Sequence, residues 1–153
     1  MATSRGYYRS ASIHGDLIVF LSEDDLWSVS VEGGPARRLT ANPGRLGRPV
    51  LSPDGKRLAF SSRDEGQNEV WVMDADGGEA RRLTYFGGFT YPAGWTPDGE
   101  SVIAASDSGQ PFIAHYHLHE VPVDGGPSRM LDLGPAMSIS HQPGGGGLVF
   151  GRN

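Results

Sequence analysis

The chain has 153 residues, of which 37% are hydrophobic and 20% charged, with 23 glycines, 11 prolines and no cysteine. The formal charge of -5 argues against nucleic acid as a partner, since such binding needs clustered Lys and Arg, and the lack of cysteine excludes disulfides and thiolate metal sites. No segment reaches the roughly 18 apolar residues of a membrane span, and the N-terminal residues 1–15 lack the apolar core of a secretion signal, so we expect a cytoplasmic protein that binds no membrane.

Two phrases recur along the chain. Residues 32–40 return with substitutions at 76–84 and at 124–132, and residues 52–56 return at 96–100. From the first copy to the second, both phrases advance by the same 44 residues. A period of this size with strand-like patterning is typical of β-propeller blades of four strands each. The sequence therefore predicts an all-β fold, an incomplete β-propeller of about three and a half four-stranded blades.

Aligned copies place the strands in chain order. The first blade, 7–40, should contain strands at 7–13, 17–20, 25–29 and 37–40. The second, 48–84, should contain strands at 48–52, 57–60, 69–73 and 81–84. The third, 91–132, should contain strands at 91–96, 101–104, 117–121 and 129–132. A fourth blade begins at 136–153, with strands at 136–141 and 147–150.

The blades form a single partial domain over residues 1–153, because a closed propeller typically needs about four to eight of them. We expect the chain to be the opening part of a longer protein. Since each blade buries its faces against its neighbours, a truncated array leaves a blade uncovered. Alone, such an array should be marginally stable or should associate, for instance with a second copy.

The connection between the second and third strands lengthens from blade to blade. It is short before Trp27, longer in the second blade, where it contains residues 63–68, and longest in the third, where it contains residues 107–111. Length differences among similar repeats fall in loops, often on the binding face. Specificity is therefore expected on this side of the blades.

Several segments resemble the N-terminal six-bladed propeller of the tricorn protease family. The resemblance covers the whole chain and is most specific over residues 7–40, with further matches at 94–99. The segments that carry it are Tyr7-Tyr8-Arg9, Ile13-His14-Gly15-Asp16, Ser22-Glu23-Asp24-Asp25-Leu26-Trp27, Arg37-Arg38-Leu39-Thr40 and Gly94-Trp95-Thr96-Pro97-Asp98-Gly99. The turn at 52–56 is less specific, because it is also similar to repeats of the TolB family and of prolyl oligopeptidase relatives.

The resemblance implies a large cytoplasmic serine peptidase that trims peptides and whose catalytic serine and histidine lie beyond this propeller. The propeller itself then serves peptide passage or product exit, with no catalytic residue and no cofactor. The channel-lining candidates are Tyr7, Arg9, Arg48 and Tyr91. Peptides and the remaining domains of the parent protein are the implied partners, and the full-length protein is implied to be a homo-oligomer.

Three alternating histidines, His115, His117 and His119, raise the question of a metal site. On a strand they would point to one side with a spacing suited to zinc. However, His119 stands where Trp27 and Trp71 stand in the earlier copies, which indicates a packing position. A metal site also needs three or four converging ligands. We therefore predict no metal, with zinc as the open alternative.

Two functions from different classes fit these patterns. The first is the non-catalytic propeller of a tricorn-like peptidase. The second is a non-enzymatic, TolB-like binding module that holds a protein partner. Fold alone cannot separate them. The lack of a secretion signal in residues 1–15 favours the first.

Overall fold

The computed structural model describes residues 7–41, 44–142 and 146–152. All regular structure among them is β-strand, so no described helix could span a membrane. The first sheet contains β1 (Tyr8–His14), β2 (Leu17–Ser22), β3 (Asp25–Ser30) and β4 (Arg37–Arg38). The second contains β5 (Leu46–Leu51), β6 (Arg57–Ser62), β7 (Glu69–Asp74) and β8 (Arg81–Arg82). The third contains β9 (Thr90–Trp95), β10 (Ser101–Ser106), β11 (His117–Pro122) and β12 (Arg129–Met130), and a hairpin follows with β13 (Ser138–His141) and β14 (Leu148–Gly151).

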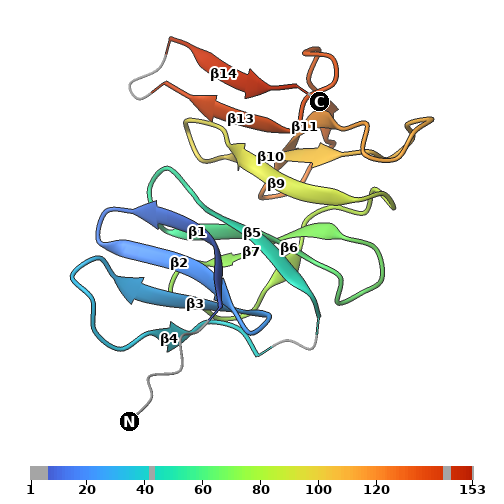
Figure 1. The fold of residues 1–153 in the computed structure, drawn as a ribbon. Helices are drawn as coiled ribbons and strands as arrows, with labels where there is room; N and C mark the ends of the chain where they lie inside the picture. The colour runs from blue at the N-terminus through green and yellow to red at the C-terminus, as the bar shows by residue number, and fades with distance from the viewer. Residues whose placement is uncertain (1–6, 42–43, 143–145, 153) are drawn as a thin grey trace.

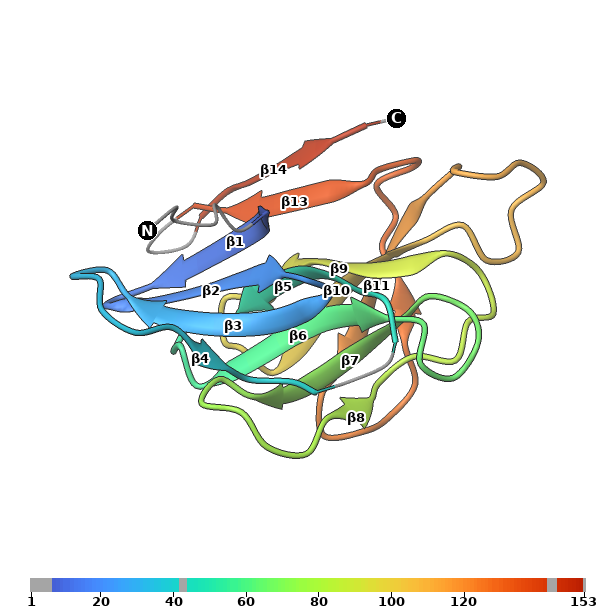
Figure 2. The ribbon, with the colours of Figure 1, turned by 60° about the horizontal axis from the view of Figure 1, so that its bottom comes forward.

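Each sheet is an antiparallel meander whose strands lie in chain order. The first strands of successive sheets are neighbours, because β1 contacts β5, β5 contacts β9 and β9 contacts β13. The sheets therefore fan out from these inner strands, as Figures 1 and 2 show. This arrangement confirms the predicted all-β fold of an incomplete propeller.

Three apolar layers lie between successive sheets. In the first layer, Val19 and Leu21 of β2 share a cluster with Phe60 of β6 and Trp71 of β7. The second layer joins the opposite face of the second sheet to the third, and the third layer joins the third sheet to the β13–β14 hairpin. Because side chains alternate along a strand, the second and third sheets are buried on both faces, which explains their near-continuous apolar strands, whereas the first sheet is covered on one face only.

Hydrogen bonds from side chains tie each inner strand to the next. Ser12 Oγ accepts a hydrogen bond from Leu51 N at 3.0 Å. Trp95 Nε1 donates to the carbonyl of Val50 at 2.9 Å. These bonds occupy backbone groups at the free edge of an inner strand, which would otherwise lack partners.

The two arginines of the repeated Arg-Arg pair make contacts with different sheets. The first arginine reaches the next sheet, since Arg37 donates to the Asp76 carbonyl and Arg81 to the Val123 carbonyl. The second arginine stays in its own sheet, where Arg82 pairs with buried Glu69. The repeat therefore encodes one contact between blades and one contact within a blade.

All predicted strands overlap observed ones, and the main differences occur at the outer strands. These contain two residues each, whereas the sequence predicts four. In the first two sheets the threonine of the repeat turns inward: Thr84 Oγ1 donates to Glu69 at 2.5 Å and accepts from Val70 N at 2.9 Å. The third copy has Asp132 at this position and an equally short strand, for which the threonine gives no reason. Residues 143–145 and 153 of the predicted fourth blade lie outside the described residues.

Candidate functional site

The strongest candidate site is a cavity of about 240 Å³ where the beginnings of β5 and β9 meet the first residues of β1. We call it the arginine cavity, after the four arginines in its lining. It is lined by Arg9, Ser10, Leu21, Arg45, Leu46, Gly47, Arg48, Ser61, Arg63, Asn68, Phe89 and Tyr91. No acidic side chain belongs to this described lining. The cavity is therefore positively charged in a protein whose net charge is negative.

Arg9 is already ion-paired, whereas Arg45 faces solvent. Arg9 forms an ion pair with Asp24 at 2.9 Å, and Asp24 is 63% exposed. Arg9 Nε is buried and makes no hydrogen bond within the described part of the chain. Arg45 is exposed at the entrance of β5. A pair that faces water on one side is weakly held, so Arg9 retains capacity to bind an anion.

The other two arginines flank a cluster of aromatic rings. The Arg48 guanidinium lies 3.7 Å from the centre of the Tyr91 ring, and that of Arg63 lies 5.3 Å from the centre of Phe89. Tyr116 completes the cluster, at 5.2 Å from Tyr91 and 6.4 Å from Phe89, both in edge-to-face geometry. Stacking orients a guanidinium without consuming its hydrogen-bond donors, so both arginines can still bind carboxylates.

The tyrosines of this cluster are uncharged at neutral pH. Burial raises the pKa of Tyr91 above its usual value of 10.0, although the Arg48 charge opposes the rise. Burial likewise raises the pKa of Tyr116, and the Asp107 carboxylate adds to it. No phenolate charge therefore offsets the positive charge of the arginines that line the cavity.

Backbone irregularities aim two of the cavity residues. The register of β1 on β2 shifts between Arg9 and Ser12, and the register of β5 on β6 shifts between Gly47 and Val50. Within the second shift Arg48 has a φ of 44°, a left-handed conformation that costs energy for a side chain of this size. Bulges of this kind re-aim side chains next to functional sites. Here the bulge of β5 carries the arginine that stacks on Tyr91.

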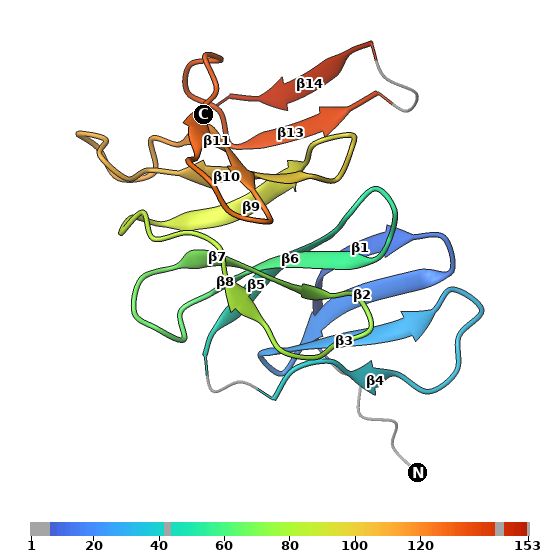
Figure 3. The same cartoon turned by 180° about the vertical axis from the view of Figure 1, so that it is seen from behind.

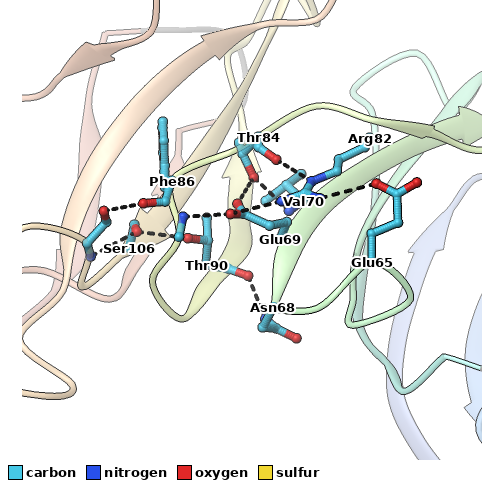
Figure 4. A network of polar contacts seen from close by, with 11 residues as sticks. Glu65, Asn68, Glu69, Val70, Arg82, Thr84, Phe86, Thr90 and Ser106 are labelled. Carbon is cyan, nitrogen blue, oxygen red and sulfur yellow. Dashed lines mark hydrogen bonds and ion pairs between the residues drawn. The ribbon is translucent and has the colours of Figure 1, made fainter.

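A buried polar network holds the loops around the cavity (Figure 4). Asn68 Nδ2 donates to the Thr90 carbonyl at 2.5 Å, and Thr90 Oγ1 lies 2.8 Å from Ser106 Oγ. Glu69 accepts from Gly87 N at 2.8 Å and fixes the β8–β9 loop. A fully bonded buried network rigidifies its surroundings, so the loops present the cavity in one geometry.

The loop between β10 and β11 borders the same side of the molecule. Asp107 holds it by two bonds, accepting from Phe89 N at 2.7 Å and from Ala114 N at 3.1 Å. The β10–β11 and β6–β7 loops, which the sequence predicts to carry specificity, both emerge at the right of Figure 1 and at the left of Figure 3. Phe89 and Arg63 connect these loops to the arginine cavity.

The other end of the inner strands carries a different cavity. It measures about 660 Å³ and is lined from all four inner strands, among others by His14, Leu51, Trp95 and His141. No Asp, Glu, Lys or Arg belongs to its described lining. The two ends of the inner strands therefore differ in charge, and only the arginine cavity is suited to anionic groups.

The predicted channel-lining residues fall in two groups. Arg9, Arg48 and Tyr91 line the arginine cavity. Tyr7 precedes β1, is 75% exposed and stacks with Arg9 at 5.6 Å, outside the cavity lining. The sequence reasoning missed Phe89 and Tyr116. Phe89 precedes β9 and Tyr116 precedes β11, so they meet Tyr91 from two separate connections that no local pattern links.

The three histidines do not converge. His115 lies before β11 rather than on it, and its ring centre is 5.5 Å from that of His117. His119 instead stacks on Phe86 at 4.9 Å. Burial, followed by the neighbouring His117 charge, lowers the pKa of His119 below 6.5. Among the described residues no group of three potential ligands could hold a metal ion.

Comparisons with known proteins point in one direction. The family model of the tricorn protease N-terminal β-propeller domain matches residues 5–153. Tricorn protease homolog 1 of Streptomyces coelicolor is 38% identical over 138 residues, which are 90% of this chain and 13% of that protein. Tricorn protease of Thermoplasma acidophilum is 36% identical over 151 residues, covering 92% of this chain and 14% of that protein.

Solved structures agree with these sequence matches. The crystal structure of the tricorn protease superposes with a TM-score of 0.78 and 31% identity, covering 91% of this chain and 14% of that one. TolB from Acinetobacter baumannii gives a TM-score of 0.79 at 22% identity, covering 96% of this chain and 38% of that one. At that identity the TolB likeness shows the fold alone. The chain spans about one seventh of the length of the Streptomyces and Thermoplasma relatives.

Proposed function

The chain belongs to the tricorn protease N-terminal β-propeller domain family, and from that premise we propose that it is a non-catalytic propeller segment that guides peptides or products of a tricorn-like peptidase. The observation that carries the proposal is the arginine cavity at one end of the inner strands. Peptides bear a terminal carboxylate, and arginine binds carboxylates through paired donors. A rigid positive entrance therefore suits a peptide passage.

The parent protein, in this proposal, is a cytoplasmic serine peptidase. Its catalytic serine and histidine belong to the remaining length, since this chain corresponds to 13% of the Streptomyces relative. Proteolysis, the cytoplasmic location and assembly into a homo-oligomer are properties we propose for that whole protein. The remaining domains of the parent are the partners of this segment.

The channel-lining role is proposed for Tyr7, Arg9, Arg48 and Tyr91. Three of them line the arginine cavity, and Tyr7 stands at its rim through its contact with Arg9. The channel-lining role is supported by the position of the cavity, which lies where the inner strands β1, β5 and β9 begin. In a propeller the inner strands surround the central channel.

The TolB-like alternative, a binding module for a protein partner, rests on fold likeness at 22% identity. Likeness of fold does not carry function. No contact or cavity among the described residues favours it over peptide passage, so we do not advance it.

Two assays of the pure chain test the proposal. Fluorogenic peptides should show no turnover above buffer, because the peptidase chemistry lies elsewhere. Fluorescence anisotropy with labelled short peptides should show binding that weakens with added salt, as expected for charges facing solvent. Measurable turnover, or no binding of any peptide, would overturn the proposal.

A further inference from the structure

The β10–β11 loop carries two bulky apolar side chains into solvent. Phe112 is 72% exposed and Ile113 is 95% exposed. They are adjacent in the sequence, at the tip of the longest of the loops that join a second strand to a third. Single exposed apolar residues are common, whereas neighbouring ones on a projecting loop indicate an interaction site.

The loop tip is held in place before any partner arrives. Asp107 binds Ala114 N, next to the tip, and Phe89 N, on the rim of the arginine cavity. Ser108 Oγ donates to the Phe86 carbonyl at 2.5 Å. His115 N bonds back to the Phe112 carbonyl at 3.4 Å. A loop fixed in this way loses little conformational freedom on binding, which favours affinity.

Hydrogen bonds to Asp107 connect the loop of the tip to Phe89 on the rim of the arginine cavity. Phe89 lies under the Arg63 guanidinium and lines the cavity, and the same residue donates its backbone N–H to the carboxylate that fixes the loop. A ligand that covers both parts would meet an apolar contact and the guanidinium groups of Arg45, Arg48 and Arg63, while the Asp107 carboxylate is bonded to backbone N–H groups between them. The opposite end of the inner strands lacks charged lining residues and offers no such combination.

We propose that the Phe112–Ile113 tip and the arginine cavity together select peptide segments in which a bulky apolar side chain stands beside carboxylates. The proposal rests on the proposed function and specifies its peptide class. The apolar side chain packs on Phe112 and Ile113, and the carboxylates pair with Arg45, Arg48 and Arg63. Arg9 contributes less, because Asp24 already neutralises part of its charge.

Charge complementarity favours peptides with carboxylates over neutral or basic peptides. Arg48 and Arg63 are oriented by stacking and have no ion-pair partner among the described residues. Carboxylates gain from fixed guanidinium groups, whereas lysine side chains would be repelled. Basic peptides should therefore be rejected by repulsion, which sharpens specificity.

The test uses the full chain and four labelled peptides of one length in fluorescence anisotropy. The reference peptide alternates Glu with Leu. Its three counterparts carry Gln for Glu, Lys for Glu, or Ser for Leu. The reference should bind at least about tenfold more tightly than the Gln and Ser counterparts, and the Lys counterpart should bind most weakly.

Variants locate the binding to this surface. The double variant Phe112→Ser with Ile113→Ser should weaken binding of the reference peptide about tenfold and leave the Ser counterpart unchanged. Arg45→Gln should weaken binding of the reference and reduce its salt dependence. Ile13→Ser and Arg129→Gln are matched controls at exposed positions outside the arginine cavity, and they should change neither quantity. Circular dichroism of each variant confirms that the fold is retained.

Other outcomes identify which idea has failed. Equal binding of all four peptides overturns the selectivity and leaves the passage role standing. Binding of none overturns both. If the double variant instead abolishes co-sedimentation with anionic phosphatidylserine vesicles, or turns a dimer into a monomer in analytical ultracentrifugation, while peptide affinities stay unchanged, the tip serves a membrane or a second copy and the proposal is wrong.

Discussion

Replacing Glu69 by Gln should destabilise the protein more than replacing Asp25 by Asn, although the two carboxylates occupy the same position in their repeats. Glu69 is fully buried and Arg82, its partner at 3.4 Å, has a side chain that is only 15% exposed. Asp25 pairs with Arg38, whose side chain is 50% exposed. Water can therefore solvate Arg38 after the substitution, whereas it cannot reach the donors that surround buried Glu69.

The magnitudes follow from the bonds that each substitution removes. A Gln amide cannot accept from both Gly87 N and Thr84 Oγ1 as Glu69 does, and hydrogen bonds to charged groups contribute about 1.5 to 3 kcal/mol each. Breaking a buried ion pair costs about 3 to 5 kcal/mol. We expect Glu69→Gln to lose about 3 kcal/mol of unfolding free energy. Asp25 is also buried and accepts the Thr40 hydroxyl, but its partner Arg38 is half-exposed, so Asp25→Asn should lose less, about 1.5 kcal/mol.

Equilibrium unfolding in urea measures both variants, with Glu79→Gln at an exposed position as the control. The control should stay within about 0.5 kcal/mol of the parent protein. The slope of the free energy against urea should be the same for all variants if only stability changes. Equal losses for Glu69→Gln and Asp25→Asn would refute the reasoning from burial.

Three further predictions follow from packing and burial. Trp71→Ala should lose about 3 to 5 kcal/mol in the same urea titration, because Trp71 is buried in the first apolar layer; a loss below about 1 kcal/mol would contradict the placement of that layer. The pKa of His119 is lowered in the folded state, so the unfolded chain binds protons more readily below pH 6.5 and stability should fall as the pH is lowered through that value; His119→Phe should flatten this dependence, and an unchanged slope would show that His119 is not its cause. Gly55→Ala should destabilise more than Gly99→Ala in thermal unfolding, because both glycines have positive φ but a Cβ at position 55 would lie 2.3 Å from His14 Cδ2 whereas one at position 99 would lie 3.6 Å from its nearest neighbour; equal shifts in Tm would be inconsistent with the close contact.

The blade pattern could be predicted because its determinants are local and repeated. Turn glycines with positive φ, such as Gly55, recur at fixed offsets, and apolar strands follow them. Register could also be inferred, since His119 pairs with Ala104 at the position where Trp71 pairs with Phe60. Alignment of the repeated segments was therefore enough to infer the strands and their register.

The site could be predicted only in part because its contacts join distant segments. The sequence places Arg48 and Tyr91 on inner strands, but it does not show that one stacks on the other across two blades. In the bulge that aims Arg48, the residue with positive φ is Arg48 itself and not the neighbouring Gly47, so the usual glycine signal does not mark it. Phe89 and Tyr116 join the cluster from two different loops, and no local pattern indicates that meeting.

The lengths of the outer strands also could not be predicted from the local sequence. The sequence predicts that Thr84 ends a strand, yet its side chain bonds the buried carboxylate of Glu69 and the strand has already ended at Arg82. Only the third copy hints at this role: it carries His117, Met130 and Asp132 at the positions of the carboxylate, the arginine and the threonine. The loss of all three together indicates that they act as a unit.

Photo-crosslinking tests the central functional claim most directly. A short peptide that bears a benzophenone side chain among glutamates is irradiated with the intact chain, and the attachment points are read by mass spectrometry. We predict crosslinks in residues 45–48, 89–91 and 107–113, which surround the arginine cavity and the loop tip. Crosslinks confined to the outer strands β4, β8 and β12, or spread evenly over the surface, would contradict a peptide entrance at the inner strands.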